Sequence, residues 1–299
     1  MSKLVAIGLP ETGKTTFLAA LWHVAESEDI QGSLRLEKIS DEAKHLNNIR
    51  SEWLSFRRVT RTIPGQEQPV SLWFRDEQND IGELAFPDLS GEEFKEAWKQ
   101  RHWPRSYDDS IADATALLLF IHPDTVKEPI SISDLQKLAE AALPQEAEAD
   151  PNAAILRDSE NTVDPAEEWD AEKAPTQVQL VEVLQFVQLR SKAEFPIRVA
   201  VIVSAWDIVT AKYGDKYVDE SGAERWLKDR LPYLEQFLRA NPEFLTVRTY
   251  GVSALGGDLR TDRAKLESFE NVSERIVIQG PDCKPHDISE PIRWCLGLR

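Results

Sequence analysis

The residues of this chain best suited to chemistry lie in the string GLPETGKT, which occupies residues 8–15. It matches the phosphate-binding pattern G-x-x-x-x-G-K-[ST]. Lys14 would contact the β- and γ-phosphates of a nucleotide, and the Thr15 hydroxyl would bind Mg²⁺. Backbone N–H groups of the loop and of the next helical turn would bind other phosphate oxygens. The residues predicted to bind the nucleotide here are Glu11, Thr12, Gly13, Lys14, Thr15 and Thr16.

Two elements must position this loop, and the sequence predicts both. Residues 3–7, KLVAI, form a short apolar run that is typical of a buried parallel strand. Residues 16–22 have helical spacing, with Phe17 and Leu21 on the apolar face. The pattern therefore lies between a strand and a helix, as phosphate binding requires.

A second candidate element follows the strand predicted over residues 82–88. Asp88 stands at the carboxyl end of that strand, and Gly91 comes three residues later. The Asp88 carboxylate would hold the metal ion or its water, and the Gly91 N–H could approach the γ-phosphate closely. Residues 70–74 predict the partner strand of a hairpin, and residues 93–101 predict a helix.

Residues 57–65, RRVTRTIPG, are basic in an acidic protein and allow two interpretations. One is a solvated loop that ends in a Pro-Gly turn. The other is a switch loop, in which Thr60 or Thr62 closes on Mg²⁺ and the γ-phosphate. In that case Arg58 or Arg61 would neutralise charge in the transition state.

Two more polar strings follow apolar strands. Residues 204–207, SAWD, come after the strand expected over 196–203, and residues 253–255, SAL, come after the strand expected over 245–252. Strands alternate with helices along the chain, which predicts a mostly parallel sheet with helices on both faces. In such folds the ligand lies outside the carboxyl ends of the strands. Four candidate elements follow strand ends in this way: residues 8–15, 88–91, 204–207 and 253–255.

The composition excludes several classes of protein. The net charge of −17 argues against nucleic acid or an anionic membrane as a partner. The longest apolar run, residues 116–121, has the length of a strand, so we expect no membrane span. No signal peptide is expected before the first strand, and two cysteines are too few for a disulfide framework or a cysteine metal site. We therefore expect a cytoplasmic protein.

The 299 residues are expected to form one domain with two insertions. Residues 40–57 predict a helix whose buried stripe is Leu46, Ile49, Trp53 and Phe56. Residues 144–175 contain ten acidic residues, two basic ones and four prolines, which is typical of a disordered segment. That segment could serve solvation or dock a partner. A further helix is expected over residues 133–142.

In their order, the four candidate elements resemble those of P-loop GTPases of the Ras-like and translation-factor superclass. The resemblance implies a three-layer α/β fold with a mostly parallel sheet, and GTP or GDP with Mg²⁺ as ligands. That family recognises guanine through an [NT]-K-x-D motif, whose aspartate pairs with the N1 and N2 groups and matches Asp207. Ser204 matches the first position loosely, and Ala205 stands where the lysine would be.

Two further positions follow from the same resemblance. The family's S-A-K motif corresponds to Ser253, Ala254 and Leu255, whose backbone would meet the guanine O6. Glu92 takes the place of the water-positioning glutamine found in Ras-like members.

A narrower resemblance is to the bacterial double-GTPase family. It rests on GLPETGKTTFLAAL, on the string DLSGE and on the C-terminal pattern Ile-x-x-Pro-Ile-x-Trp. Members of that family are encoded in gene clusters thought to be bacterial conflict or defence systems.

The sequence thus supports a GTP-hydrolysing switch that signals to a protein partner. Lys14, Glu92, Arg58 and Arg61 would serve catalysis in this hypothesis, and Gly91 would lie by the γ-phosphate. Two alternatives remain open: an ATPase of the same fold, because the guanine-binding lysine is absent, and a nucleotide-held scaffold with little turnover. The sequence does not indicate the oligomeric state, the partner, the hydrolysis rate or which threonine binds Mg²⁺.

Overall fold

A single mixed sheet of eight strands forms the centre of the computed structural model, which describes residues 2–40, 43–57, 70–87, 91–129, 173–194 and 196–299. The strands lie in the order β2-β3-β4-β1-β5-β6-β7-β8. Their bounds are β1 Lys3–Gly8, β2 Arg35–Ile39, β3 Val70–Arg75, β4 Ile81–Phe86, β5 Ala116–Ile121, β6 Ile197–Ser204, β7 Leu245–Ser253 and β8 Val277–Gln279.

The five central strands, from β4 to β7, are parallel to one another, whereas the outer strands pair antiparallel. The register sets Gly8 opposite Phe120, Ile121 opposite Val203 and Ser204 opposite Val252. The carboxyl ends of β1, β5, β6 and β7 therefore line up at one edge of the sheet. This edge brings together the loop after β1 and the polar residues after β6 and β7.

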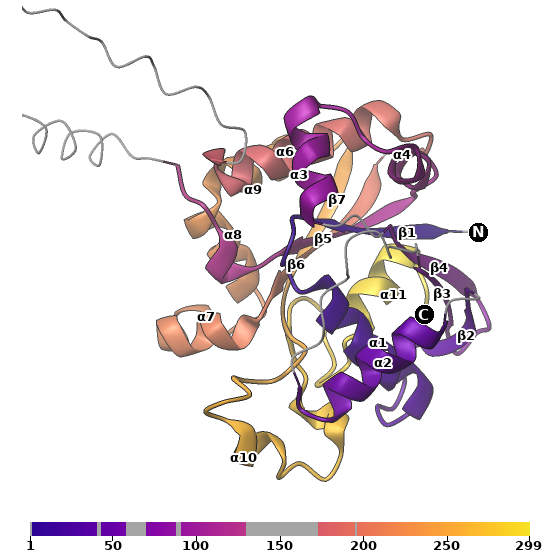
Figure 1. The fold of residues 1–299 in the computed structure, drawn as a ribbon, viewed down its shortest axis with the longest axis vertical. Coiled ribbons are helices and arrows are strands. Elements are labelled where there is room, and N and C mark those ends of the chain that lie inside the picture. The colour runs from indigo at the N-terminus through magenta and orange to yellow at the C-terminus, as the bar shows by residue number, and fades with distance from the viewer. Residues whose placement is uncertain (1, 41–42, 58–69, 88–90, 130–172, 195) are drawn as a thin grey trace, which may run out of the picture.

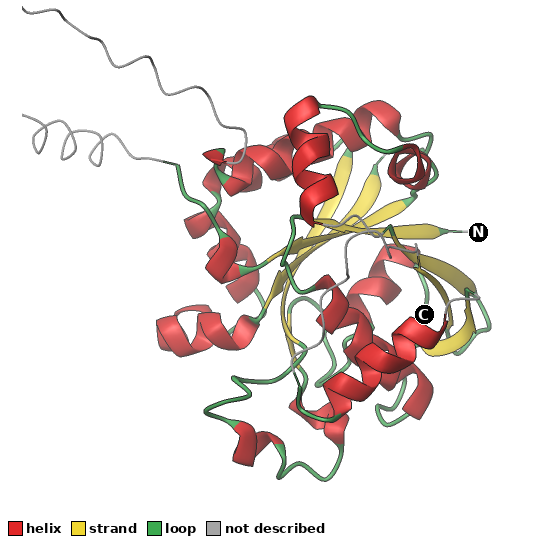
Figure 2. Ribbon diagram, viewed as in Figure 1, coloured by secondary structure: helices red, strands yellow, loops and turns green. Residues whose placement is uncertain are grey.

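Helices cover both faces of this sheet, as Figures 1 and 2 show, and the α/β fold predicted from the sequence is confirmed. The helices are α1 Lys14–Ser27, α2 Ala43–Leu54, α3 Gly91–Gln100, α4 Arg105–Ala112, α6 Thr176–Arg190, α7 Trp206–Tyr213, α8 Gly222–Arg230, α9 Pro232–Ala240, α10 Arg263–Leu266 and α11 Glu290–Leu296. The described residues also form the short 3₁₀ helices η1 Pro123–Thr125, η3 Gly214–Tyr217 and η4 Val272–Arg275.

Alternating side chains of the central strands divide the interior into two cores. Ala6, Leu118 and Ile202 face α1, α2 and α11 on one side of the sheet. Ile7 and Leu119 face α3, α4, α6, α8 and α9 on the other side. Because both faces of β1, β5 and β6 are covered, their sequences are largely apolar, as expected for buried parallel strands.

The sequence-based assignments are wrong at several helix positions. Phe56 lies beyond the end of α2 and has a φ of +52°, so the helix expected over 40–57 is shorter. Thr176 begins α6, and its hydroxyl accepts a hydrogen bond of 2.8 Å from the Lys127 N–H. The helices α4 and α7 were not predicted; α7 buries only Trp206 and Val209, which is too weak a periodic signal.

The helix expected over residues 133–142 and most of the acidic segment 144–175 lie outside the described residues. At the end of that segment, Ala174 is buried and its carbonyl accepts a hydrogen bond of 2.8 Å from the Gln179 side chain. The boundary of the insertion therefore comes before Ala174. No helix formed by the described residues is long and apolar enough to span a bilayer.

Candidate functional site

The loop between β1 and α1 is held closed by its own side chains. The Lys14 ammonium donates to the Gly8 and Leu9 carbonyls at 3.0 Å each and lies 3.4 Å from the Thr12 hydroxyl. The buried Thr12 hydroxyl donates to the Leu9 carbonyl at 2.8 Å. These bonds place the Lys14 charge over the loop, where it would meet phosphate oxygens of a bound nucleotide.

Two glycines allow the loop to pack this tightly. A Cβ atom on Gly8 would come within 2.8 Å of the Phe120 carbonyl oxygen. Gly13 has a φ of +83°, and a Cβ atom there would lie 3.2 Å from the Ser204 hydroxyl oxygen. Gly13 is thus needed both for its left-handed conformation and for its contact with the end of β6.

The N-terminus of α1 is arranged for an anion. Gly13 is its cap, and within the described part of the chain no side chain caps the helix and no acidic residue lies in its first turn. The positive end of the helix dipole is therefore not offset by a carboxylate. Thr15 and Thr16 lie half-buried in that first turn, with Thr15 providing an oxygen ligand of the type that Mg²⁺ accepts.

A small cavity lies beside the loop, on the side of α3 and α4. Gly8, Pro10 and Lys14 line it from the loop, together with Pro87, Phe94 and Tyr107. Pro87 directly precedes Asp88, and α3 begins at Gly91. Burial raises the pKa of the Tyr107 hydroxyl, so this residue is neutral at ordinary pH. The chain after β4 therefore approaches the loop at the Lys14 end.

The polar residues after β6 and β7 meet at the other end of the site. The Ser253 hydroxyl donates to Asp207 Oδ1 and accepts a hydrogen bond of 2.9 Å from the Gly256 N–H. Ser204 instead donates to the Ile121 carbonyl at 3.2 Å, next to Gly13. Asp207 and Ser253 thus form one unit, and Ser204 joins that end of the sheet to the phosphate-binding loop.

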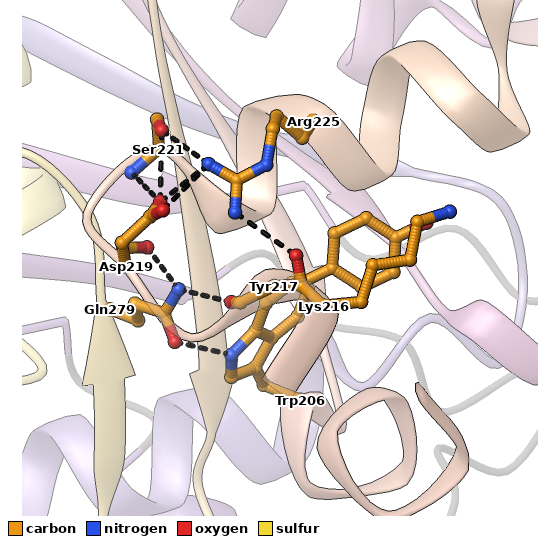
Figure 3. A network of polar contacts seen from close by, with 7 residues as sticks. All are labelled: Trp206, Lys216, Tyr217, Asp219, Ser221, Arg225 and Gln279. Carbon is orange, nitrogen blue, oxygen red and sulfur yellow. Dashed lines mark hydrogen bonds and ion pairs between the residues drawn. The ribbon is translucent and has the colours of Figure 1, made fainter. Parts of the chain in front are cut away.

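Helix α7, which carries Asp207, is anchored through its buried Trp206 (Figure 3). The Trp206 indole N–H donates to Gln279 Oε1 at 3.0 Å, and the Gln279 amide donates to the carbonyls of Tyr217 and Asp219. A Cβ atom on Gly251 would come within 2.3 Å of the indole ring, so the absence of a side chain at Gly251 lets Trp206 pack closely against β7.

The same network continues to Arg225 (Figure 3). Arg225 contacts both carboxylate oxygens of Asp219 at 2.6 and 2.8 Å and donates to the Lys216 carbonyl at 3.0 Å. Hydrogen bonds from Arg225 and then from Ser221 lower the pKa of Asp219. This ion pair fixes the loop that holds Gln279, and through it the position of α7.

Several predicted site residues cannot be placed. Those outside the described residues are Arg58, Thr60, Arg61, Thr62 and Asp88. The backbones of Gly91 and Glu92 lie in the first turn of α3, but nothing is described of the Glu92 side chain. Among the described residues, no group of three His, Cys, Asp or Glu side chains could hold a metal ion. Of the predicted metal ligands, the structure therefore describes only Thr15.

Sequence reasoning missed Gln279 and Trp206 as supports of the site. Gln279 follows the short apolar run 276–278, and its role depends on the pairing of β8 with β7. Trp206 occupies the variable third position of the [NT]-K-x-D motif, so the motif gave no reason to select this residue.

Comparisons with known proteins place the chain in a family. A sequence model of the family described as Double-GTPase 1 matches residues 5–295. No curated protein matches the chain.

Three solved structures illustrate what the fold is similar to. One is sup35 complexed with GDP, at 10% identity and a TM-score of 0.34, covering 86% of this chain and 38% of that one. Another is the S. cerevisiae Ski7 GTPase-like domain bound to GTP, at 9% identity and a TM-score of 0.37, covering 86% of this chain and 43% of that one. The chain spans less than half the length of these two. A third is the SRb-GTP/SRX complex of the signal recognition particle receptor from Chaetomium thermophilum, at 14% identity and a TM-score of 0.37, covering 89% and 98%.

Proposed function

The chain belongs to the Double-GTPase 1 family and is a GTPase, and from this premise we propose a Mg²⁺-dependent molecular switch whose nucleotide state is recognised by a protein partner. The observation that carries this proposal is the joint placement of two groups on one edge of the sheet. Lys14 and the N-terminus of α1 would bind the phosphates, and the Asp207–Ser253 pair would bind the base.

Catalysis would consist mainly of positioning and charge neutralisation. Lys14 would stabilise charge on the β- and γ-phosphates, with Arg58 or Arg61 adding positive charge. Glu92 would orient the water that attacks the γ-phosphate, near the Gly91 N–H. These roles follow from the family resemblance and from the approach of β4 and α3 to the Lys14 end of the loop.

The predicted metal site is compatible with the donors present. Mg²⁺ usually keeps several waters and is bound by one or two protein oxygens together with substrate phosphates. Thr15 would hold it, with Asp88 and Thr60 or Thr62 as further ligands. The ion would neutralise charge on the phosphates.

At the base end, Asp207 would accept hydrogen bonds from guanine N1 and N2, and the backbone of Ala254 would meet O6. Ser253 supports this proposal, because its hydrogen bond holds Asp207 at the end of β7. The aspartate would therefore be pre-oriented before the base arrives.

Two other functions each rest on one observation. An ATPase of the same fold is favoured by Ala205, which has a left-handed conformation at the cap of α7 and no side chain to cover a guanine ring. A nucleotide-held scaffold with little turnover is favoured by Glu92 in place of glutamine. The acidic segment 144–175 would then dock a partner.

The wider role is proposed from the family resemblance alone. The switch would act in the cytoplasm and would belong to a bacterial conflict or defence system. It would not bind nucleic acid and would not span a membrane. GTP would order residues 57–65 and 88–102, and hydrolysis to GDP would release them.

Phosphate release by the isolated protein tests this function against the scaffold. We expect turnover of GTP in the presence of Mg²⁺, and a fall in kcat of at least about tenfold in Glu92→Ala without loss of GTP affinity. Glu93→Ala, a change of the neighbouring acid, is the matched control. No turnover by the wild-type protein, alone or with candidate partners, would favour the scaffold.

A further inference from the structure

The buried Trp53 of α2 is in direct contact with the loop that follows β7. Its side chain is fully buried, and its indole N–H donates to the Ala254 carbonyl at 2.9 Å. The helix α2 lies between β2 and β3 in the chain, about two hundred residues from Ala254. Yet Ala254 is the residue whose peptide group would face the base. The inserted helix therefore reaches the base end of the site.

Trp53 is itself held in place by Arg275, at the end of η4. The Arg275 guanidinium lies 3.7 Å from the centre of the Trp53 ring and 4.5 Å from that of Phe56. It also donates to the Trp53 carbonyl at 2.6 Å. Only 1% of Arg275 is exposed, and burial lowers its pKa to about 10. A buried cation between two aromatic faces keeps the indole from rotating.

The loop from Ser253 to Gly257 also packs against Arg275. Gly256 has a φ of +82°, and a Cβ atom there would lie 2.0 Å from the Arg275 carbonyl oxygen. The Gly256 N–H in turn binds the Ser253 hydroxyl, which binds Asp207. Direct contacts thus run from Arg275 through Trp53 and the loop to Asp207.

We propose that Trp53 is a positioning residue that orients the Ala254 peptide group for the nucleotide base, with Arg275 fixing the indole. Trp53 does not touch the base. Its hydrogen bond to the Ala254 carbonyl sets the plane of the neighbouring peptide, and so the direction of the N–H groups available to the base. This inference rests on the proposed function, because it requires the base to bind at Asp207 and Ala254.

The proposal predicts that a change at Trp53 weakens the affinity for a nucleotide, which has a base, and leaves the affinity for a phosphate chain without a base almost unchanged. Trp53→Phe removes the indole N–H but keeps an aromatic ring for Arg275 to stack on. One net hydrogen bond corresponds to roughly a fivefold change in affinity. The Trp53 ring also lies 5.3 Å from the His23 ring of α1, measured between ring centroids, so the affinity for a phosphate probe without a base must be measured beside that for the nucleotide.

Trp226 offers a matched control. It is equally buried, in the core on the other face of the sheet, and its indole N–H has no hydrogen-bond partner among the described residues. Trp226→Phe therefore removes the same volume from the interior without removing a hydrogen bond of the indole N–H. Any general loss of stability from the smaller ring should appear in both variants.

The experiment measures by calorimetry the affinities of wild type and both variants for two probes with Mg²⁺. One probe is GDP or ADP, whichever the wild type binds more tightly, and the other is inorganic tripolyphosphate. We expect Trp53→Phe to lose about fivefold for the nucleotide and less than twofold for tripolyphosphate, with both affinities unchanged in Trp226→Phe. Equal losses for both probes, or no loss relative to Trp226→Phe, would overturn the proposal.

Two provisions keep the test decisive. If Trp53→Phe does not fold, Arg275→Lys keeps the charge but loses the planar stack, and the same selective loss for the nucleotide is expected. Equal losses for both probes in that variant would again overturn the proposal. A wild type that prefers ADP contradicts guanine recognition, whereas the comparison of variants still decides the role of Trp53.

Discussion

The Ser253 hydroxyl donates a hydrogen bond to Asp207 Oδ1 and so joins the end of β7 to the first turn of α7. The two residues are 46 positions apart in the chain. They meet because β6 and β7 are parallel neighbours whose register sets Ser204 opposite Val252. Because this hydrogen bond occupies Oδ1, it determines which side of the Asp207 carboxylate remains for a ligand.

Replacing Asp207 by asparagine should change the preferred base. Asparagine places an N–H₂ donor where the carboxylate accepts from guanine N1 and N2, whereas xanthine carries an oxygen acceptor at C2. We expect Asp207→Asn to bind GTP at least about tenfold more weakly and to bind XTP more tightly than wild type does. Nucleotide titrations with both bases measure this.

Asp215→Asn is the control for that change, since it removes the same charge from an exposed position. Its GTP affinity should match that of wild type. If Asp207→Asn showed the wild-type ratio of GTP to XTP affinity, Asp207 would not contact the base.

Lys14→Ala should abolish binding of nucleoside triphosphates. The ammonium that lies over the loop, 3.0 Å from the Gly8 and Leu9 carbonyls, is lost, and with it the charge for the β- and γ-phosphates. Binding of fluorescent GTP measures the effect, and thermal unfolding reports whether the loop still folds. Lys228→Ala, at an exposed position on α8, should bind as wild type does. Equal affinity in Lys14→Ala would rule out the assigned phosphate site.

His23 should make the protein less stable in mild acid. This residue is buried, and burial followed by the nearby Arg50 lowers its pKa, while Asp29 raises it by a smaller amount. The folded state therefore binds a proton less readily than the unfolded state, so this loss of stability begins as the pH falls below about 6.5 and grows toward the folded pKa.

Unfolding by urea at pH 7.5 and pH 5.5 tests this expectation. His23→Gln should lose less stability between the two pH values than wild type does, and His102→Gln, at an exposed position, should behave as wild type. The same loss in His23→Gln as in wild type would show that His23 is not responsible.

The sequence predicts the phosphate end of the site better than the base end. The loop 8–15 is one continuous string whose spacing is fixed by its own backbone, so Lys14 and Gly13 are found without knowledge of the fold. The strands β5 and β6 were likewise evident, because burial on both faces requires nearly continuous apolar runs. In β7 that pattern is interrupted by Thr246, Arg248 and Thr249.

The supports of the base end depend on contacts that no local pattern encodes. Trp53, Arg275 and Gln279 come from different segments and act only once α2, η4 and β8 are packed together. Trp53 was identified as part of an apolar stripe, which is correct, but its indole N–H has a second role at Ala254. Apolar residues at helical spacing indicate which side chains are buried, but they do not indicate which group a buried polar atom bonds to.

Competition for the nucleotide site tests guanine recognition, the central claim, most directly. Labelled GTP bound to the wild-type protein with Mg²⁺ is titrated with unlabelled GTP and, separately, with unlabelled ATP. The Asp207–Ser253 pair predicts that ATP is at least about a hundredfold weaker a competitor than GTP, because adenine lacks the N1 and N2 donors that a carboxylate would bind. Displacement by ATP at the same concentration as GTP would contradict guanine recognition at Asp207.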